Sequence, residues 1–183
     1  MSDVTVLGLA GSLRLASVNR GLLRAAVEAS PPGVSVEIFE IRDVPLYDGD
    51  IEDLGDPPPV AELKRRLLES DALLLSTPEY NRGMPGVLKN VLDWASRPPE
   101  QALQGKVVTM MGATPGGFGT RSSQFQLKQI LGNPGAIVVP KPEVWVSHAG
   151  QRFDDDGNLT DDDTRQQITE LLVALGEFVR TLR

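Results

Sequence analysis

The chain has 183 residues, enough for one domain with a substantial core, and we expect a single domain over residues 1–183. Its 18 Lys and Arg residues against 25 Asp and Glu residues give a formal net charge of −7, which argues against nucleic acid or an anionic membrane as a partner. The chain has no cysteine, which excludes disulfides, a thiolate nucleophile and a cysteine metal site.

Strand and helix patterns alternate from the N-terminus to the C-terminus. Short apolar or alternating runs predict strands at residues 4–10, 34–41, 72–76, 106–112 and 136–140. Helical spacing of apolar residues predicts helices at residues 20–30, 60–70, 85–96, 124–132 and 164–182. This alternation predicts an α/β fold, a parallel sheet with helices on both faces.

The N-terminal segment reads as a strand and lacks the basic start of a signal peptide. No apolar run reaches the roughly 18 residues that a membrane span needs. We therefore expect a cytoplasmic protein with no membrane partner.

Ligands of such sheets bind beyond the carboxyl ends of the strands, which directs attention to three connecting segments. The first, "GSLRLASVNR" at residues 11–20, offers hydroxyl, amide and guanidinium groups before a helix and so suits a phosphate. Ser and Asn are equally common as plain helix caps, so this pattern alone leaves both readings open. Neither a dinucleotide fingerprint nor a Walker loop is present.

The second segment, "TPEYNRGMPG" at residues 77–86, follows a strand that reads as buried. Its acid, aromatic and amide side chains suit the edge of a planar heterocycle better than they suit a turn. The third, "GATPGGFGTRS" at residues 112–122, contains adjacent glycines that permit close approach to a flat group, although a surface turn explains them as well.

Three other features favour ordinary structural roles. The only histidine, His148, has no partner ligands for a metal. The acidic run at residues 154–163 does not fit a calcium loop and reads as solvated, with Asp161–Asp163 suited to the start of the last helix. The basic triplet at residues 64–66 reads as the exposed face of its helix.

The three segments together, with the second extended to "TPEYNRGMPGVLKNVLDW", resemble the NADPH-dependent FMN reductase family. The resemblance runs from Val4 to the last helix. It implies a flavodoxin-like, five-stranded parallel sheet of order 2-1-3-4-5. It also implies FMN as cofactor, NADPH or NADH as electron donor, and a small acceptor that is a quinone, azo or nitro compound, metal ion or free flavin.

The resemblance also assigns cofactor-binding residues. The phosphate loop corresponds to Ser12, Arg14, Ser17 and Asn19, the border of the isoalloxazine ring to Pro78, Glu79, Tyr80 and Asn81, and the loop near the pyrimidine end to Thr114, Pro115, Gly116 and Gly117. Around the ring we expect backbone amides to contribute more than side chains. Flavin carries the redox chemistry, so no catalytic side chain and no metal ligand is assigned.

Two further function classes stay open at this point. A flavodoxin would shuttle single electrons without a substrate, but it would favour a T-x-T-G-x-T phosphate loop and more than 5% aromatic residues. A flavin-free protein that kept the fold is the other alternative.

The apolar residues Val87, Val91 and Trp94 suit either packing on the sheet or an interface. The family resemblance implies a homodimer or homotetramer. It also implies a ping-pong reaction in which donor and acceptor share one open flavin face.

Overall fold

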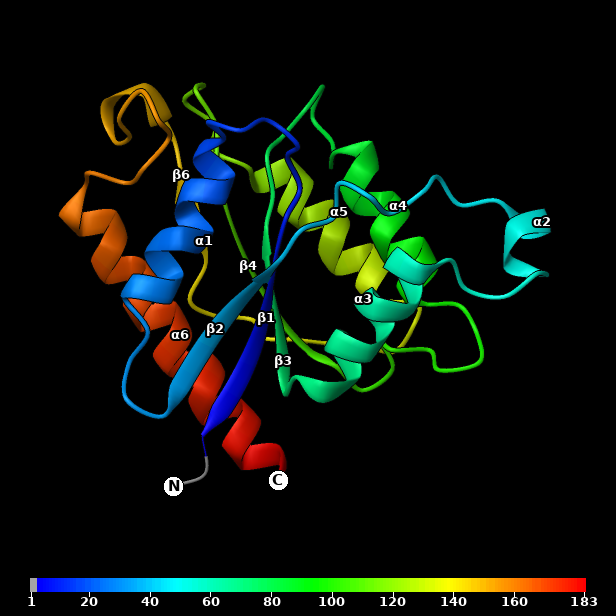
Figure 1. The fold of residues 1–183 in the computed structure, drawn as a ribbon. Coiled ribbons are helices and arrows are strands. Elements are labelled where there is room, and N and C mark those ends of the chain that lie inside the picture. The colour runs from blue at the N-terminus through cyan, green and yellow to red at the C-terminus, as the bar shows by residue number, and fades with distance from the viewer. Residues whose placement is uncertain (1–2) are drawn as a thin grey trace.

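A computed structural model describes residues 3–183, whose fold is a parallel sheet between two layers of helices (Figure 1). The strand order β2-β1-β3-β4-β5 is the flavodoxin-like order that the family resemblance implied, and a sixth strand, β6, also pairs with β4. The strands are β1 (Val4–Ala10), β2 (Val34–Phe39), β3 (Ala72–Ser76), β4 (Val107–Ala113), β5 (Ile137–Val138) and β6 (Val144–Val146).

Helices cover both faces of the sheet. The helices are α1 (Val18–Glu28), α2 (Gly49–Glu52), α3 (Pro58–Glu69), α4 (Gly86–Ala95), α5 (Arg121–Gly132) and α6 (Asp162–Leu182), with a 3₁₀ turn η1 (Ala149–Gln151). Apolar side chains of α1 and α6 form one core cluster with the sheet, and those of α3, α4 and α5 form the other. Within β3, Leu74 faces the first cluster and Leu73 and Leu75 face the second, as alternation along a strand requires. No helix in the described part of the chain is long and apolar enough to cross a membrane.

The last edge of the sheet is built from two short strands where the sequence predicted one at residues 136–140. β5 pairs with Val107 and Val108, and β6 pairs with residues 111–113 of the same neighbour, β4. Pro140 and Pro142 lie between them, and proline lacks the N–H that a strand interior donates. The prolines therefore split one edge into two pieces.

Capping residues explain why the helix starts differ from the predicted ones. The Ser17 hydroxyl accepts the N–H groups of Asn19 and Arg20, so α1 begins at Val18. Asp161 accepts the N–H of Thr164, which starts α6 at Asp162. The short helix α2 interrupts the Pro- and Asp-rich connection before α3, where the sequence predicted only irregular chain.

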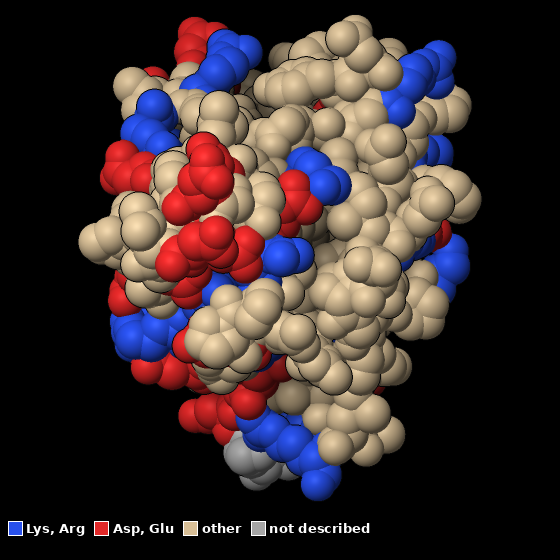
Figure 2. Space-filling view, turned by 90° about the vertical axis from the view of Figure 1, so that its right-hand side faces the viewer, with Lys and Arg blue, Asp and Glu red and all other residues tan. Residues whose placement is uncertain are grey.

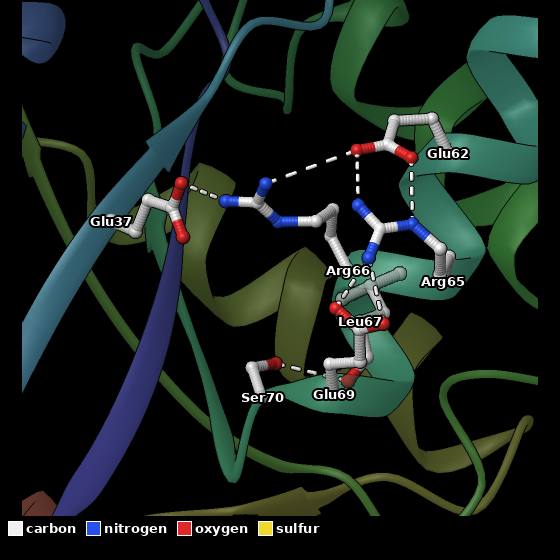
Figure 3. Close-up of polar contacts among 7 residues, drawn as sticks. All are labelled: Glu37, Glu62, Arg65, Arg66, Leu67, Glu69 and Ser70. Carbon is white, nitrogen blue, oxygen red and sulfur yellow. Dashed lines mark hydrogen bonds and ion pairs between the residues drawn. The ribbon is translucent and has the colours of Figure 1, made fainter.

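The exposed side of α3 carries an ion-pair network. The prediction that residues 64–66 lie on this side holds for Arg65 and Arg66. Figure 3 shows Arg65 between Glu62 and Glu69, and Arg66 reaching Glu37 of β2. The prediction was wrong for Lys64, which is 1% exposed. Its ammonium binds Asp56 at 2.7 Å and the Pro98 carbonyl at 3.1 Å, so it joins the segments before α3 and after α4.

Candidate functional site

Three loops leave the sheet at the same level, and they are the segments that the sequence singled out. Ala10 at the end of β1 lies beside Ser76 of β3, which lies beside Met111 of β4. The N–H of Gly11 continues the ladder to the Ser76 carbonyl at 2.8 Å. The first loop (residues 11–17), the second loop (77–84) and the third loop (114–120) therefore meet at one edge.

Two glycines permit the close packing of these loops. A Cβ on Gly112 would lie 2.2 Å from the Thr77 carbonyl oxygen and 2.3 Å from Thr120 Oγ1. A Cβ on Gly11 would lie 2.9 Å from Pro85. Any other residue at Gly112 would push the second and third loops apart, which the sequence pattern alone did not reveal.

The first loop has one uncommitted cation. The arginine that follows Arg14 along the chain, Arg20 in the first turn of α1, forms an ion pair with Glu40 beyond β2. The side chain of Arg14 is exposed and has no ion-pair or hydrogen-bond partner within residues 3–183, the part of the chain that the structure describes. The backbone N–H groups of Leu15 and Ala16 also make no hydrogen bond to these residues. The loop thus presents a guanidinium and free N–H donors beside the hydroxyls of Ser12 and Ser17.

Asn19 lies behind the first loop and joins it to the two neighbouring strands. Its side-chain amide donates to the Ala113 carbonyl at 2.9 Å and accepts from the Ala113 N–H at 2.9 Å. The Ser76 hydroxyl donates to the same Asn19 oxygen at 3.3 Å. The residue is 2% exposed, so the amide that the sequence assigned to a phosphate is committed to the ends of β3 and β4.

The carboxylate of Glu79 in the second loop points to the start of α5. One oxygen accepts the N–H groups of Ser122 and Ser123 at 2.9 and 3.2 Å. Thr120, at the cap position of α5, provides no such bond. Glu79 therefore caps α5 from another loop and complements the positive end of its dipole.

A tight turn forms the tip of the second loop. Tyr80 and Gly83 exchange both backbone hydrogen bonds, at 3.0 and 2.9 Å, and the two residues between them have φ values of 49° (Asn81) and 64° (Arg82). Left-handed backbone at two consecutive non-glycine residues is strained. The turn uses the N–H of Tyr80 internally, and within residues 3–183 the N–H groups of Asn81 and Arg82 make no hydrogen bond.

The third loop is fixed at both sides of an exposed tip. The Thr114 N–H donates to the Val146 carbonyl and the Thr114 carbonyl accepts the Ala149 N–H, while the Gly116 carbonyl accepts the His148 N–H at 3.1 Å. Since carbonyl and N–H point in opposite directions across a trans peptide, the Gly117 N–H is directed away from His148. Pro115, Gly116 and Gly117 are exposed.

The sequence predicted a surface or hydrogen-bonded structural role for His148, and the structure places this residue on the surface, against the third loop. It is exposed, with a φ of 51°, and a Cβ on Gly117 would lie 3.2 Å from its Nε2. Within residues 3–183 no group of three or more His, Asp or Glu side chains is placed to hold a metal ion.

A pocket of about 660 Å³ adjoins the second and third loops on the side of α5. Its rim contains stacked cations and rings: Arg82 lies 4.8 Å from the centre of Phe118, and Arg121 lies 4.3 Å from that of Trp145. Phe125 in its wall is 74% exposed. No residue of the first loop lines this pocket.

The apolar side of α4 is buried within the chain. Trp94 is 0% exposed, and its indole N–H donates to the Pro45 carbonyl at 2.9 Å. The Tyr47 ring lies edge-on to it at 5.0 Å. Packing within the chain, one of the two roles left open for these residues, is therefore the one observed: the connection before α3 covers Trp94, and Val91, 1% exposed, belongs to the core cluster of α3, α4 and α5.

Comparisons with known proteins agree with this architecture. The family model described as NADPH-dependent FMN reductase matches residues 4–151. An NAD(P)H-dependent FMN reductase of Pseudomonas aeruginosa is 46% identical, covering 99% of this chain and 98% of its own. An NAD(P)H:quinone oxidoreductase of Solanum tuberosum is 42% identical, covering 98% and 95%. Among solved structures, the flavoenzyme FerB of Paracoccus denitrificans, an NAD(P)H:(acceptor) oxidoreductase, superposes with a TM-score of 0.87 at 32% identity, covering 97% and 98%.

Proposed function

The chain belongs to the NADPH-dependent FMN reductase family, and we propose that it passes electrons from NAD(P)H through FMN to a quinone or another small acceptor. Flavin-dependent NAD(P)H oxidoreduction is the chemistry of this family. The acceptor class, the shared open face and the individual flavin contacts are our proposal. The observation that carries it is the meeting of three loops at one sheet edge, with the Arg14 guanidinium of the first loop unpaired by the described residues.

The first loop suits the phosphate of FMN. Arg14, the hydroxyls of Ser12 and Ser17 and the N–H groups of Leu15 and Ala16 are donors without an anionic partner of their own in the described residues. The helix α1 begins directly behind them and adds its positive end. In this proposal Asn19 orients the loop through Ala113 and does not contact the phosphate, because its amide is already bonded.

The second and third loops suit the flavin ring. Because the Glu79 carboxylate caps α5, we infer that backbone groups of Asn81 and Arg82, with the face of Tyr80, would border the ring. Pro78, Thr114 and Pro115 shape the wall, and the exposed glycines Gly116 and Gly117 leave room for the pyrimidine end. We infer that the Gly117 N–H, which is directed away from His148, would stabilise negative charge on that end, as a donor in an oxyanion hole does.

Bound FMN supplies a two-electron carrier that accepts hydride from a nicotinamide. The protein side chains hold and orient the ring and exclude water from its buried face, and we assign none of them to proton or hydride transfer. A single open face requires NAD(P)H and the acceptor to occupy the same place in turn. We therefore expect ping-pong kinetics.

A turnover screen tests this proposal. The FMN-loaded protein is assayed with NADPH and NADH against a quinone, an azo dye, a nitroaromatic compound, a ferric salt and free FMN. We expect quinones to be reduced with at least one nicotinamide. A protein that holds FMN but reduces none of these acceptors would instead fit the flavodoxin alternative. An archaeal flavodoxin superposes with a TM-score of 0.62 at 14% identity, and this likeness concerns the fold alone.

We further propose a cytoplasmic homodimer or homotetramer. Figure 2 shows that the face carrying α2 is divided between a strongly charged part and a broad part with few charges. Leu46 and Leu54, which flank α2, are 79% and 90% exposed. They replace the buried residues of α4 as the candidate dimer surface, and Phe125 offers a second surface for a tetramer.

A further inference from the structure

The first part of the acidic run forms a short hairpin, Phe153–Leu159, where the sequence predicted a solvated loop. Phe153 and Leu159 are bridged as a short antiparallel pair and are 9% and 6% exposed. The Asp154 carboxylate accepts the backbone and side-chain N–H groups of Asn158 at 2.7 and 3.1 Å. At its tip Gly157 is buried, although the residues on either side are exposed.

The buried tip packs directly on the backbone of the first loop. A Cβ on Gly157 would lie 3.0 Å from the carbonyl carbon and oxygen of Ala16 and 3.2 Å from the carbonyl carbon of Ser17. On the other side, a Cβ on Gly21 of α1 would lie 1.8 Å from the Gly157 carbonyl oxygen. Glycines at both positions allow the hairpin to touch the peptide that joins the first loop to α1.

Arg24 of α1 holds the hairpin in this place. Its Nε donates to the Asn158 side-chain oxygen at 3.0 Å, and its Nη2 donates to the Gly157 carbonyl at 3.0 Å and the Asp156 carbonyl at 3.4 Å. The hairpin is therefore fixed to the helix whose first residues form the phosphate end of the site.

We propose that the hairpin Phe153–Leu159, through Gly157 and its clamp Arg24, positions the first loop for the phosphate of FMN. This inference rests on the proposed function, because it assumes that the first loop binds that phosphate. Gly157 and Arg24 are positioning residues: they touch the backbone of Ala16 and Ser17 or the hairpin, and the loop in turn presents the donors. A displaced loop would lose phosphate contacts while the ring contacts of the other two loops persist.

The test compares Gly157→Ala with Gly105→Ala in the full chain freed of flavin. Both glycines have left-handed backbone, with φ values of 74° and 71°, so alanine strains both equally. Only Gly157 has neighbours, because nothing lies within 4 Å of a Cβ at Gly105. Isothermal titration with FMN and with riboflavin, which lacks the phosphate, is carried out on both variants and the wild type.

We expect Gly157→Ala to weaken FMN by about tenfold, the equivalent of one hydrogen bond to a charged group, with riboflavin affinity unchanged. Gly105→Ala should change neither affinity. Unchanged FMN affinity in Gly157→Ala, or an equal loss for both flavins, would overturn the positioning role. A wild type that does not prefer FMN over riboflavin would instead overturn the phosphate site itself.

If Gly157→Ala does not fold, Arg24→Met gives the same test, since it removes three hydrogen bonds to the hairpin and adds nothing to the loop. Arg24→Lys keeps the charge but not the forked donors. Positioning predicts that both variants lose FMN affinity selectively. Full FMN affinity in Arg24→Lys would mean that the charge alone matters and would overturn the role of Arg24.

Discussion

Replacing Asn19 by alanine tests whether its side chain is a buried structural link to β3 and β4 or a ligand of the FMN phosphate. Its side chain makes three hydrogen bonds, two to the backbone of Ala113 and one to the Ser76 hydroxyl. All three residues are buried, so water does not replace the lost partner. The substitution leaves the N–H and carbonyl of Ala113 without the bonds that join the first loop to β4.

The expected cost follows from these bonds. A buried backbone group left unsatisfied costs about 1–3 kcal/mol, and each further lost bond about 0.5–1.5 kcal/mol. We therefore expect Asn19→Ala to lower the free energy of unfolding by about 2–6 kcal/mol, a large part of the roughly 5–15 kcal/mol of a typical protein. The three loops should loosen together, so FMN and riboflavin should lose affinity by similar factors.

Urea unfolding followed by tryptophan fluorescence, with titration of both flavins, measures these quantities. Asn90→Ala is the matched control, because its amide also donates to a backbone carbonyl (Pro45, 2.8 Å) and accepts a backbone N–H (Tyr47, 2.7 Å), away from the three loops. We expect the control to lose stability without losing flavin affinity. If Asn19→Ala keeps the wild-type stability and loses affinity for FMN alone, Asn19 is a phosphate ligand and the structural role is refuted.

Four further outcomes are expected. Arg14→Ala should weaken FMN by about 10- to 150-fold in isothermal titration and leave riboflavin unchanged, because a charged hydrogen bond contributes about 1.5–3 kcal/mol; equal losses would show that Arg14 only supports the loop. Steady-state rates should give parallel double-reciprocal lines, and intersecting lines would require separate donor and acceptor sites. Light scattering should find the wild type larger than its 19.8 kDa chain and the Leu46→Glu, Leu54→Glu variant smaller than the wild type, whereas a fully active wild-type monomer would rule out the assembly. Asp161→Ala should lower the free energy of unfolding by about 1 kcal/mol through loss of the α6 cap. The Thr164 hydroxyl and N–H and the Arg152 guanidinium lower the pKa of Asp161, so this stabilisation is present above the unfolded-state pKa of about 3.9 and is lost as pH falls further. Urea unfolding at a series of pH values measures it, and a variant that loses stability at acidic pH just as the wild type does would contradict the role of Asp161.

Local patterns were sufficient for most of the fold. The apolar run at residues 72–76 became β3 with the predicted bounds, because five residues match the length of a buried strand and are too few for a typical helix. Edges were harder to predict: the prolines after Val138 divide the last edge between β5 and β6, and the second strand is only three residues long. Helices α1 and α6 begin two residues earlier than the apolar pattern predicted, because their caps, Ser17 and Asp161, lie three residues before the predicted starts.

The sequence predicted which loops form the candidate site but not where their individual side chains point. The loops were predictable because parallel strands place their carboxyl ends together. The direction of single side chains was not, since it depends on distant partners: Asn19 bonds to a residue 94 positions away, and Glu79 caps a helix 43 positions away. The same holds for Trp94, whose cover comes from Pro45, 49 positions earlier.

Anaerobic mixing of the FMN-loaded protein with NADPH or NADH tests the central claim most directly. We predict that the absorbance of the oxidised flavin disappears with at least one nicotinamide and returns when a quinone is added under the same conditions. Flavin that stays oxidised with both nicotinamides would show that the chain carries FMN without accepting hydride, and would contradict the account.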